Sequence, residues 1–378
     1  MTTSLYLITG QSLATGLAPA LRNRPVAPDR AFCLTGGPVA ANGNAAGLPI
    51  RPLSEIRTET IASGFAAQLL AQDPNHKRLI VGQAWRGQPY ASVKKGGNSG
   101  VYEALVAQAQ LAETACQYLE PGAILLLHGE TDGALGTVGY DRMLKEWLNN
   151  LQQDVSAALE RDGTMPMLFC QTSSISGYCN GQDRSHFQTP LAQLQASRDD
   201  ENLVLIGPKY ALDYIDWAHL DARSTRFHGE QFAKVLSRLK RGEPWAPLSP
   251  NYLEVDGTRL RIHFHVPAPP LVIDTDLVTD PGHFGFYLED PVAKITGLEI
   301  VKPKVLDLTL SAPVQANAKL SYALQNGKAG ISGRKFGARG CLRDSDPTTS
   351  EFGYGSLFNW CVAFSEVLPS RGRLKIGA

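Results

Sequence analysis

Two short polar segments of the sequence carry the residue types that acyl transfer needs. Gly10-Gln11-Ser12 directly follows the apolar run 5–9. A serine at the exit of a strand lies at the sheet edge among backbone N–H groups, as an acyl-transfer nucleophile must. Asp216 precedes His219 by three residues, so its carboxylate can accept a hydrogen bond from Nδ1–H and leave Nε2 free to take the serine proton. Residues 10–12 could instead form a purely structural turn, and His219 could instead cap the next helix. Each segment alone therefore leaves a catalytic and a structural role open.

Two further polar segments also follow apolar runs. Trp85-Arg86-Gly87-Gln88 comes after the run 78–83, and its glycine could bring a backbone N–H close to a ligand as half of an oxyanion hole. His128-Gly129-Glu130-Thr131 comes after the run 123–127, where either a site or a polar turn is expected. Because the carboxyl ends of parallel strands meet at one edge of a sheet, the four segments together predict a nucleophile, oxyanion donors and a base with its orienting acid at one site.

The spacing of apolar residues predicts the elements that would position these segments. Five short apolar runs are typical of strands buried on both faces, at 5–9, 78–83, 123–127, 167–171 and 203–207. Helical patterns lie between them, and 140–161 is the clearest because its apolar residues recur every three or four positions. Strands that alternate with helices predict a three-layer α/β/α domain over residues 1–243, with a five-stranded parallel sheet.

A different pattern begins after a proline-rich segment, 244–250, which we interpret as a linker. In residues 259–266 apolar and polar side chains alternate, which is the period of a strand with one buried face. Further strand-like runs follow without a strong helix, at 271–274, 283–288, 295–301, 305–311 and 319–324. Residues 251–378 are therefore expected to form a smaller all-β sandwich domain.

The polar segments together resemble the SGNH hydrolases, in particular the branch of sialic-acid-specific acetylesterases and acetylxylan esterases. That branch opens with GQS, as in Gly10-Gln11-Ser12, and has a glycine-rich turn like residues 85–88. It continues with a block like QGES, matched by His128-Gly129-Glu130-Thr131, and ends with DxxH, matched by Asp216 to His219. The resemblance covers roughly residues 4–240 and implies an SGNH/flavodoxin-like sheet.

The resemblance also implies a role for each residue. Ser12 would be the nucleophile, His219 the general base and Asp216 the acid that orients it. The backbone N–H groups of Ser12 and Gly87 would hold the oxyanion, and no metal or organic cofactor is implied. The other residues expected in the oxyanion and substrate-binding region are Gln11, Gln88, His128, Glu130 and Thr131.

The sequence departs from the family pattern at the third and last blocks. His128 stands where a glutamine usually precedes Gly-Glu, and Thr131 stands near the place of the asparagine that supplies a further oxyanion donor. In some relatives the acidic partner lies further upstream of the histidine, which makes Asp213 a rival to Asp216. Glu130 could either bind substrate or support the site, and the sequence leaves both open.

Composition argues against several other classes of function. The 36 Lys+Arg balance the 36 Asp+Glu, so neither nucleic acid nor an anionic membrane is expected as the main partner. No run approaches the roughly 20 apolar residues that span a bilayer, and residues 1–9 lack the basic region of a signal peptide. We therefore expect synthesis in the cytoplasm, although a virion component or a non-classically exported effector would look the same. The six cysteines are expected as free thiols, with a Cys341–Cys361 bridge as the alternative.

The expected function is that of a carbohydrate O-acetylesterase acting on an acetylated glycan, with an oligomeric state that the sequence does not indicate. A lipase or thioesterase of the same superfamily is the first alternative and would prefer long acyl chains. A non-catalytic glycan-binding or structural protein on a hydrolase fold is the second alternative, and it would not need Ser12, His219 and Asp216 together.

Overall fold

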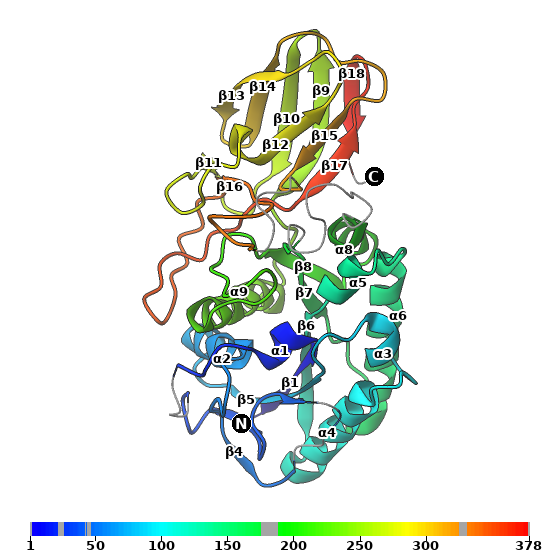
Figure 1. Ribbon diagram of the computed structural model, residues 1–378. Helices are drawn as coiled ribbons and strands as arrows, with labels where there is room; N and C mark the ends of the chain where they lie inside the picture. Colours follow the sequence, from blue (N-terminus) through cyan, green and yellow to red (C-terminus); the bar gives the residue numbers. More distant parts are fainter. Residues whose placement is uncertain are drawn as a thin grey trace.

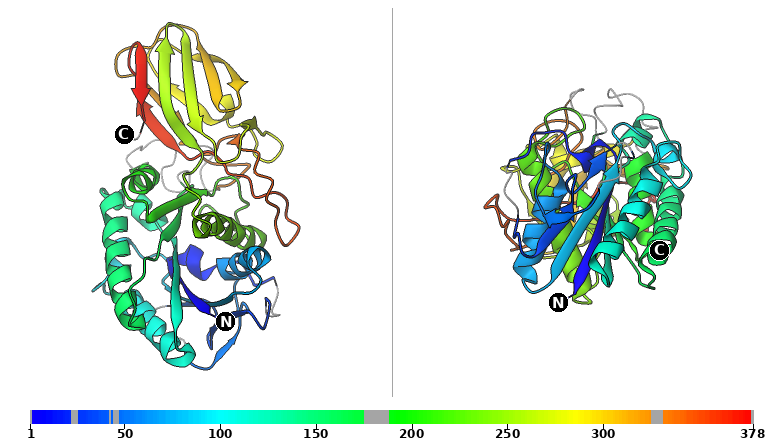
Figure 2. Two further views of the ribbon diagram at one scale, coloured as in Figure 1. Left: turned by 180° about the vertical axis from the view of Figure 1, so that it is seen from behind. Right: turned by 90° about the horizontal axis from the view of Figure 1, so that it is seen from below.

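The computed structural model describes residues 2–21, 26–41, 43, 47–174, 188–324 and 331–376. An α/β part formed by the N-terminal segments and a β part formed by the C-terminal segments are stacked end to end (Figure 1). The views from behind and from below show the same elongated arrangement, with the long α-helices confined to the α/β part (Figure 2).

One mixed sheet forms the centre of the α/β part, in the order β4-β2-β5-β1-β6-β7-β8, with β3 paired to β5. Neighbouring strands are parallel except β2 and β4, which run antiparallel. The strands are β1 Thr3–Gly10, β2 Ala31–Leu34, β3 Ala40–Ala41, β4 Ile50–Pro52, β5 Lys77–Ala84, β6 Leu119–Leu127, β7 Met167–Gln171 and β8 Leu203–Pro208.

The predicted α/β class is confirmed, and the five expected strands pair in parallel, but the sheet has 8 strands in place of five, and one of its edges is antiparallel. The five expected strands are β1, β5, β6, β7 and β8. The additional strands β2, β3 and β4 have 4, 2 and 3 residues. Strands this short hold too few apolar residues for either a continuous run or an alternation to be recognised.

β1 illustrates why the central strands contain runs of consecutive apolar residues. Leu5 and Leu7 pack into the core on one face of the sheet, and Tyr6 and Ile8 pack into the core on the other face. Successive side chains of a strand point to opposite faces, so a strand that is covered on both faces needs an apolar side chain at each step. The first polar positions after such a strand therefore lie at the edge of the sheet.

Helices cover both faces of this sheet, which confirms the three-layer arrangement (Figure 1). One face is covered by α2 (Ile61–Gln72) and α9 (Ala222–Lys240), and the other by α4 (Val101–Cys116), α6 (Tyr140–Leu159) and α8 (Gln188–Asp199). Three short helices follow strand ends: α1 (Ser12–Thr15), α3 (Tyr90–Val93) and α5 (Glu130–Ala134).

Antiparallel sheets form the β part, in the orders β13-β14-β10-β9-β18, β12-β15-β17 and β11-β16. Leu260 and Ile262 of the first sheet share one apolar core with Phe286 and Phe364 of the second, as predicted for a sandwich. The strands are β9 Ser249–Asp256, β10 Arg259–His265, β11 Val272–Ile273, β12 Phe286–Glu289, β13 Ile295–Lys302, β14 Val305–Leu310, β15 Lys319–Tyr322, β16 Leu342–Arg343, β17 Phe364–Val367 and β18 Gly372–Lys375.

Some element boundaries of the β part differ from the prediction. The strand expected at 283–288 begins only at Phe286, because His283–Gly285 form a 3-10 turn (η2) in which His283 has a positive φ. β9 begins at Ser249 and thus includes the end of the segment 244–250 that we interpreted as a linker. Within that segment Trp245 donates its Nε1–H to the carbonyl of Leu205 in β8 at 2.9 Å. β9, β16, β17 and β18 were not among the expected strands.

Buried polar contacts join the two parts. Lys234 of α9 is buried and its Nζ donates to Asp346 Oδ2 at 2.9 Å. Gln171, at the end of β7, exchanges two hydrogen bonds with the backbone of Ala363, at 2.9 and 2.7 Å. Because a buried charge that loses its partner costs several kcal/mol, the Lys234 contact favours one fixed placement of the β part on the α/β part.

The cysteines of the described residues carry no disulfide. Cys33, Cys116, Cys170, Cys341 and Cys361 are free, so the alternative of a Cys341–Cys361 bridge is wrong, and Cys179 lies outside the described residues. Within the same residues, no helix combines the length and apolar character that a membrane crossing requires. They also contain no group of three or more His, Cys, Asp or Glu side chains arranged to hold a metal ion.

Two glycines allow α2 and α9 to cross at close range, and replacing them should destabilise the fold. A Cβ at Gly64 would overlap the carbonyl of Arg226, and a Cβ at Gly229 would overlap that of Ile61. Alanine favours a helix by about 1 kcal/mol over glycine, but overpacking costs about 1–3 kcal/mol or more. We therefore expect Gly64→Ala and Gly229→Ala to lower the free energy of unfolding in denaturant titrations.

Gly47→Ala is the matched control, because a Cβ at Gly47 meets no atom within 4 Å. It should unfold at nearly the same denaturant concentration as the wild type. If all three variants were equally stable, the close approach of α2 and α9 would not be a constraint on the fold.

Candidate active site

The carboxyl end of β1 turns sharply into α1 and presents Ser12. Gly10 has a φ of +135°, and a Cβ there would overlap the carbonyl oxygen of Leu127, the last residue of β6. Gln11 donates its backbone N–H to the same carbonyl at 3.0 Å. Only glycine permits this approach and conformation, so the backbone itself places Ser12 beside the end of β6.

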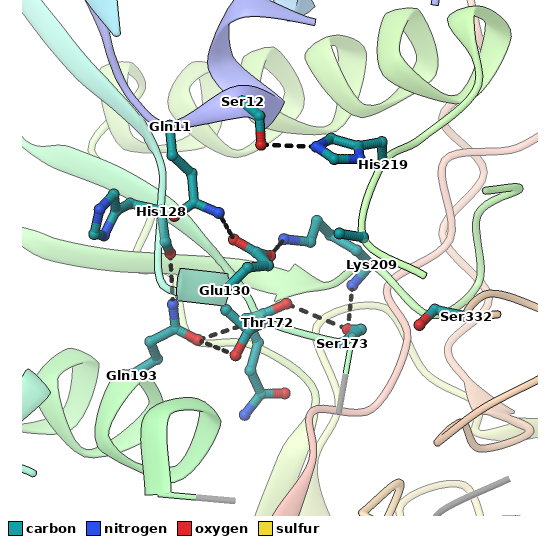
Figure 3. A network of polar contacts seen from close by, with 12 residues as sticks. Gln11, Ser12, His128, Glu130, Thr172, Ser173, Gln193, Lys209, His219 and Ser332 are labelled. Carbon is teal, nitrogen blue, oxygen red and sulfur yellow. Dashed lines mark hydrogen bonds and ion pairs between the residues drawn. The ribbon is translucent and has the colours of Figure 1, made fainter. Parts of the chain in front are cut away.

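Ser12, His219 and Asp216 form one chain of hydrogen bonds. Ser12 Oγ lies 2.8 Å from His219 Nε2, as Figure 3 shows, and His219 Nδ1 lies 2.7 Å from Asp216 Oδ2. An ionised carboxylate can only accept, so Nδ1 carries the proton of the neutral ring and Nε2 accepts the hydroxyl proton of Ser12. This tautomer is the one in which His219 can act as a base toward Ser12.

The loop that contains Asp216 prepares its carboxylate for this contact. Asp216 Oδ1 accepts the backbone N–H groups of Ala218 and His219, each at 2.7 Å. Partial burial raises the pKa of Asp216, but the two backbone donors and the His219 ring outweigh it and hold the pKa below its ordinary value. The carboxylate therefore stays ionised at neutral pH and keeps the proton on Nδ1.

Asp213, the alternative candidate for the orienting acid, forms an ion pair with an arginine and not with His219. Arg334 of the β part binds it with both ends of its guanidinium group, with Nε 2.6 Å from Oδ1 and the second nitrogen on Oδ2. The carboxylate that is bonded to the His219 ring is that of Asp216. The structure thus brings Asp216 and not Asp213 to the histidine.

The Gln11 side chain belongs to a buried polar network beside Ser12 (Figure 3). Its Nε2 donates to Glu130 Oε2 at 3.0 Å, and Lys209 forms an ion pair with the other oxygen of Glu130. Glu130 is 1% exposed and Lys209 is fully buried. Burial lowers the pKa of Lys209, but Cys170 and Glu130 raise it above its ordinary value, so the ammonium keeps its charge. Glu130 is thus placed to support Gln11, and it is not exposed as a ligand for a substrate.

Two other residues of the third block contribute to support as well. Thr131 donates its backbone N–H to Gln11 Oε1 at 3.4 Å. The buried His128 ring has Nδ1 2.7 Å from the hydroxyl of Tyr140 and Nε2 3.0 Å from the carbonyl of Gln88. Both ring nitrogens are engaged, so the expected contact of His128 with the oxyanion or substrate is not what the structure shows.

His128 instead holds the turn that carries Gly87. Burial lowers the pKa of His128, and the neutral ring can donate Nε2–H to the Gln88 carbonyl while Nδ1 accepts from Tyr140. On the other side of Gly87, Arg86 donates to Thr15 Oγ1 at 3.2 Å and to the Gly16 carbonyl at 2.8 Å. The turn is therefore fixed to α1 and to β6 on either side of the exposed Gly87.

Lys209 is the residue of this site that sequence reasoning missed. It lies two positions after the expected strand 203–207 and directly follows β8, which ends at Pro208. The rule that selected the other segments, polar residues at the carboxyl end of a buried strand, applies to Lys209 as well. A single lysine gives no indication of its role in the sequence, however, and the structure shows that role through the ion pair with Glu130.

A cavity of about 660 Å³ lies beside the helix that carries Ser12. Its lining includes Thr15 of α1, residues 36–41, Glu55, Arg57 and Arg86. Thr15 belongs to the same short helix as Ser12, whereas Ser12 and His219 are not among the residues that line the cavity.

Comparison with known proteins identifies the family of the chain. Residues 2–238 match the family model described as "Carbohydrate esterase, sialic acid-specific acetylesterase". The chain belongs to this family. Membership confirms the resemblance and makes the protein a carbohydrate O-acetylesterase, a carboxylic ester hydrolase. Among curated proteins, none matches the esterase in sequence.

Several solved structures are similar to the esterase at low sequence identity, and XAC1771 shares its fold. XAC1771, a carbohydrate acetylesterase from Xanthomonas citri, is 16% identical with a TM-score of 0.61 over 96% of this chain and 80% of that one. The Arabidopsis thaliana protein AT4G34215 is 17% identical, with a TM-score of 0.47 over 62% of this chain and 98% of that one. NanS is 15% identical, with a TM-score of 0.49 over 64% and 98%. The alignment with XAC1771 spans both the α/β part and the β part.

Removing the charge of Lys209 should weaken both the fold and the site. Breaking a buried ion pair by deleting one partner costs about 3–5 kcal/mol, because the other charge is left uncompensated. We expect Lys209→Met to lower the melting temperature and the kcat on an aryl acetate, since Gln11 loses its fixed acceptor. Lys209→Met/Glu130→Gln should regain stability, because a neutral amide still accepts from Gln11.

The control for Lys209 is Lys145→Met, which removes an exposed lysine 4.0 Å from Asp200. Exposed pairs contribute about 0–1 kcal/mol, so this variant should melt like the wild type. A melting temperature of Lys209→Met equal to that of Lys145→Met would contradict the role given to the buried pair.

Glu55, in the wall of the cavity, should make stability depend on pH. Burial and the neighbouring Glu59 raise the pKa of Glu55 to about 8, against the hydrogen bonds from Ser63 and Thr60. In the unfolded chain a glutamate ionises near pH ~4.3. The neutral Glu55 carboxyl therefore contributes fully to the free energy of unfolding below that pH, and this contribution is lost as the pH rises toward 8. We expect the melting temperature of Glu55→Gln, relative to the wild type, to rise between about pH 5 and pH 8. A difference that stays constant across this range would show that Glu55 is already ionised in the fold.

Proposed function

We propose that the protein removes O-acetyl groups from a carbohydrate through an acyl-enzyme formed on Ser12. The observation that carries the proposal is the chain of hydrogen bonds from Ser12 Oγ through His219 to Asp216, at 2.8 and 2.7 Å. A serine hydroxyl is a weak nucleophile at its own pKa, and a base within hydrogen-bond reach activates it. The ionised Asp216 supports that base by fixing its tautomer and stabilising the imidazolium form.

The reaction proceeds in two halves. Ser12 Oγ attacks the acetyl carbonyl carbon while His219 Nε2 takes its proton, and the carbonyl oxygen becomes an oxyanion. The bond to the sugar oxygen then breaks, His219 returns the proton to that oxygen, and the acetyl group stays on Ser12. In the second half a water molecule, deprotonated by His219, attacks the acetyl group, so that acetate leaves and Ser12 regains its hydroxyl proton.

We assign the oxyanion to the backbone N–H groups of Ser12 and Gly87. Ser12 is the first residue of α1, where backbone N–H groups have no acceptor inside the helix. Gly87 lies on the turn that Arg86 and the Gln88 carbonyl hold against α1 and β6. Thr131 donates its backbone N–H to Gln11, which supports a role in the framework instead of that of a further oxyanion donor.

The cavity beside α1 supports a carbohydrate as the alcohol half of the ester. Its wall combines the guanidinium groups of Arg57 and Arg86 and the hydroxyl residues Thr58 and Thr60 with apolar residues such as Val39 and Ile56. Such a mixed wall can contact both the hydroxyl groups and the apolar faces of a sugar. A long-chain lipase would instead need a predominantly apolar channel next to Ser12. The arginine and threonine side chains in this wall favour an acetylated sugar over the lipase or thioesterase alternative.

The first test compares the hydrolysis of an aryl acetate and an aryl octanoate by the wild type and Ser12→Ala. We expect fast acetate turnover, little octanoate turnover, and a loss of about a thousandfold or more in kcat for the variant. Preference for octanoate would support the lipase alternative. Equal rates for wild type and variant would exclude Ser12 as nucleophile and support the non-catalytic alternative.

A second test separates the two candidate acids. Asp216→Asn should lower kcat by about 10⁴, because an asparagine lets the His219 ring take the tautomer that cannot accept the serine proton. Asp213→Asn keeps the His219–Asp216 contact and should lower kcat by no more than about tenfold. The reverse order of the two losses would assign the orienting role to Asp213.

A further inference from the structure

The loop that carries His219 is held by a segment of the β part. We call this segment, Ser332-Gly333-Arg334, the clamp. Ser332 Oγ donates to the carbonyl of Trp217 at 2.6 Å, and Arg334 Nε donates to Asp213 Oδ1 at 2.6 Å. Figure 3 shows Ser332 beside the strand-end loop that leads from Lys209 to His219. The clamp thus contacts the loop on both sides of Asp216 in the sequence.

The backbone of the clamp lies unusually close to the loop. Arg334 donates its backbone N–H to the Leu212 carbonyl at 3.2 Å. A Cβ at Gly333 would lie 2.7 Å from that carbonyl oxygen and 2.9 Å from the ring of Tyr214. A residue with a side chain could therefore not take the place of Gly333 without moving the loop. On its other side the clamp is anchored to the β part, since the Arg334 carbonyl accepts from Thr279 N at 2.9 Å.

The loop also has hydrogen bonds of its own, which make it a single unit. Ile215 N donates to the His219 carbonyl at 2.9 Å, and Asp221 N donates to the Asp213 carbonyl at 3.1 Å. The α/β part holds the loop through Leu212 and Leu220, which are buried in its core, and through Asp213 N, which donates to Ser224 Oγ of α9 at 3.0 Å. The clamp adds contacts from the β part, which Lys234 and Gln171 in turn hold on the α/β part.

We propose that Ser332 and Arg334 are positioning residues for His219, so that the β part is a component of the catalytic apparatus. The inference rests on the proposed function of Ser12 and His219. A catalytic group that is misplaced by about 1 Å can lose about 100-fold in rate, so a base on a loop needs rigid support. The side chains of Arg334 and Asp213 are 36% and 39% exposed, so their ion pair contributes little to overall stability. Substitutions in the clamp can therefore lower kcat without a matching loss in the free energy of unfolding.

The experiment uses the full chain and the double variant Ser332→Ala/Arg334→Ala. We expect kcat on an aryl acetate to fall about 100-fold while KM stays unchanged, because the clamp touches the base-carrying loop and not the cavity. Covalent labelling of Ser12 by an aryl phosphonate should slow in parallel, since it also needs His219 in place. Amide hydrogen exchange of peptides covering residues 212–221 should become faster.

Arg261→Ala is the matched control. It removes another bidentate arginine–carboxylate pair of the β part, with Asp307 at 2.7 and 2.7 Å, which lies between β10 and β14. This variant should keep the wild-type kcat and labelling rate. Arg334→Lys, which retains a charge opposite Asp213, should recover part of the loss that Arg334→Ala causes.

Several outcomes would overturn the inference. Wild-type kcat and labelling in the double variant would show that the clamp does not position His219, and a raised KM with unchanged kcat would place the clamp in substrate binding. If the double variant fails to fold, the single variant Ser332→Ala offers the same readouts, because it removes only the hydrogen bond to the Trp217 carbonyl. Loss of activity in Ser12→Ala together with full activity of the clamp variant overturns this inference alone, whereas full activity of Ser12→Ala removes the proposed function and this inference with it.

Discussion

The approach of Gly10 to the carbonyl of Leu127 determines where the reacting group of this esterase can be. The end of β1 meets the end of β6 so closely that no side chain fits between them, and the next two residues are Gln11 and Ser12. The serine is therefore positioned by the backbone of two central strands, whose side chains are buried on both faces of the sheet. Such strands belong to the most stable part of a fold, which gives the nucleophile a rigid platform.

The two carboxylates near Ser12 show how surroundings separate their tasks. Glu130 is buried, and Lys209 balances its charge, so that it acts as a fixed acceptor for Gln11. Asp216 is partly exposed and is kept ionised by backbone N–H groups and by the His219 ring. The first carboxylate is part of the framework, while the second faces the group that must gain and lose a proton.

Sequence patterns were sufficient for long elements and for residues directly attached to them. The five central strands and the segments that follow them were predicted, and the structure brings Ser12, His219 and Asp216 together. Contacts between distant segments were not predictable: Lys209 is 79 positions from Glu130, and Arg334 is 121 positions from Asp213. The sequence places His128 at the right strand end but does not reveal that its ring points to the Gln88 carbonyl. Pairings of this kind depend on how the strands are ordered in space. The spacing of apolar residues within one segment carries no information about that order.

The contacts of the β part with β8, with α9 and with the His219 loop have a consequence for how such proteins are assembled in evolution. A module that is joined by a flexible tether can be exchanged between enzymes without cost to either partner. Here Trp245, in the segment 244–250 that connects the two parts, is hydrogen-bonded to Leu205 of β8. The backbone at Gly333 lies so close to the His219 loop that no side chain fits between them. Transfer of this sandwich onto another esterase would therefore require the receiving loop to change with it, so the two parts are expected to be inherited as one unit.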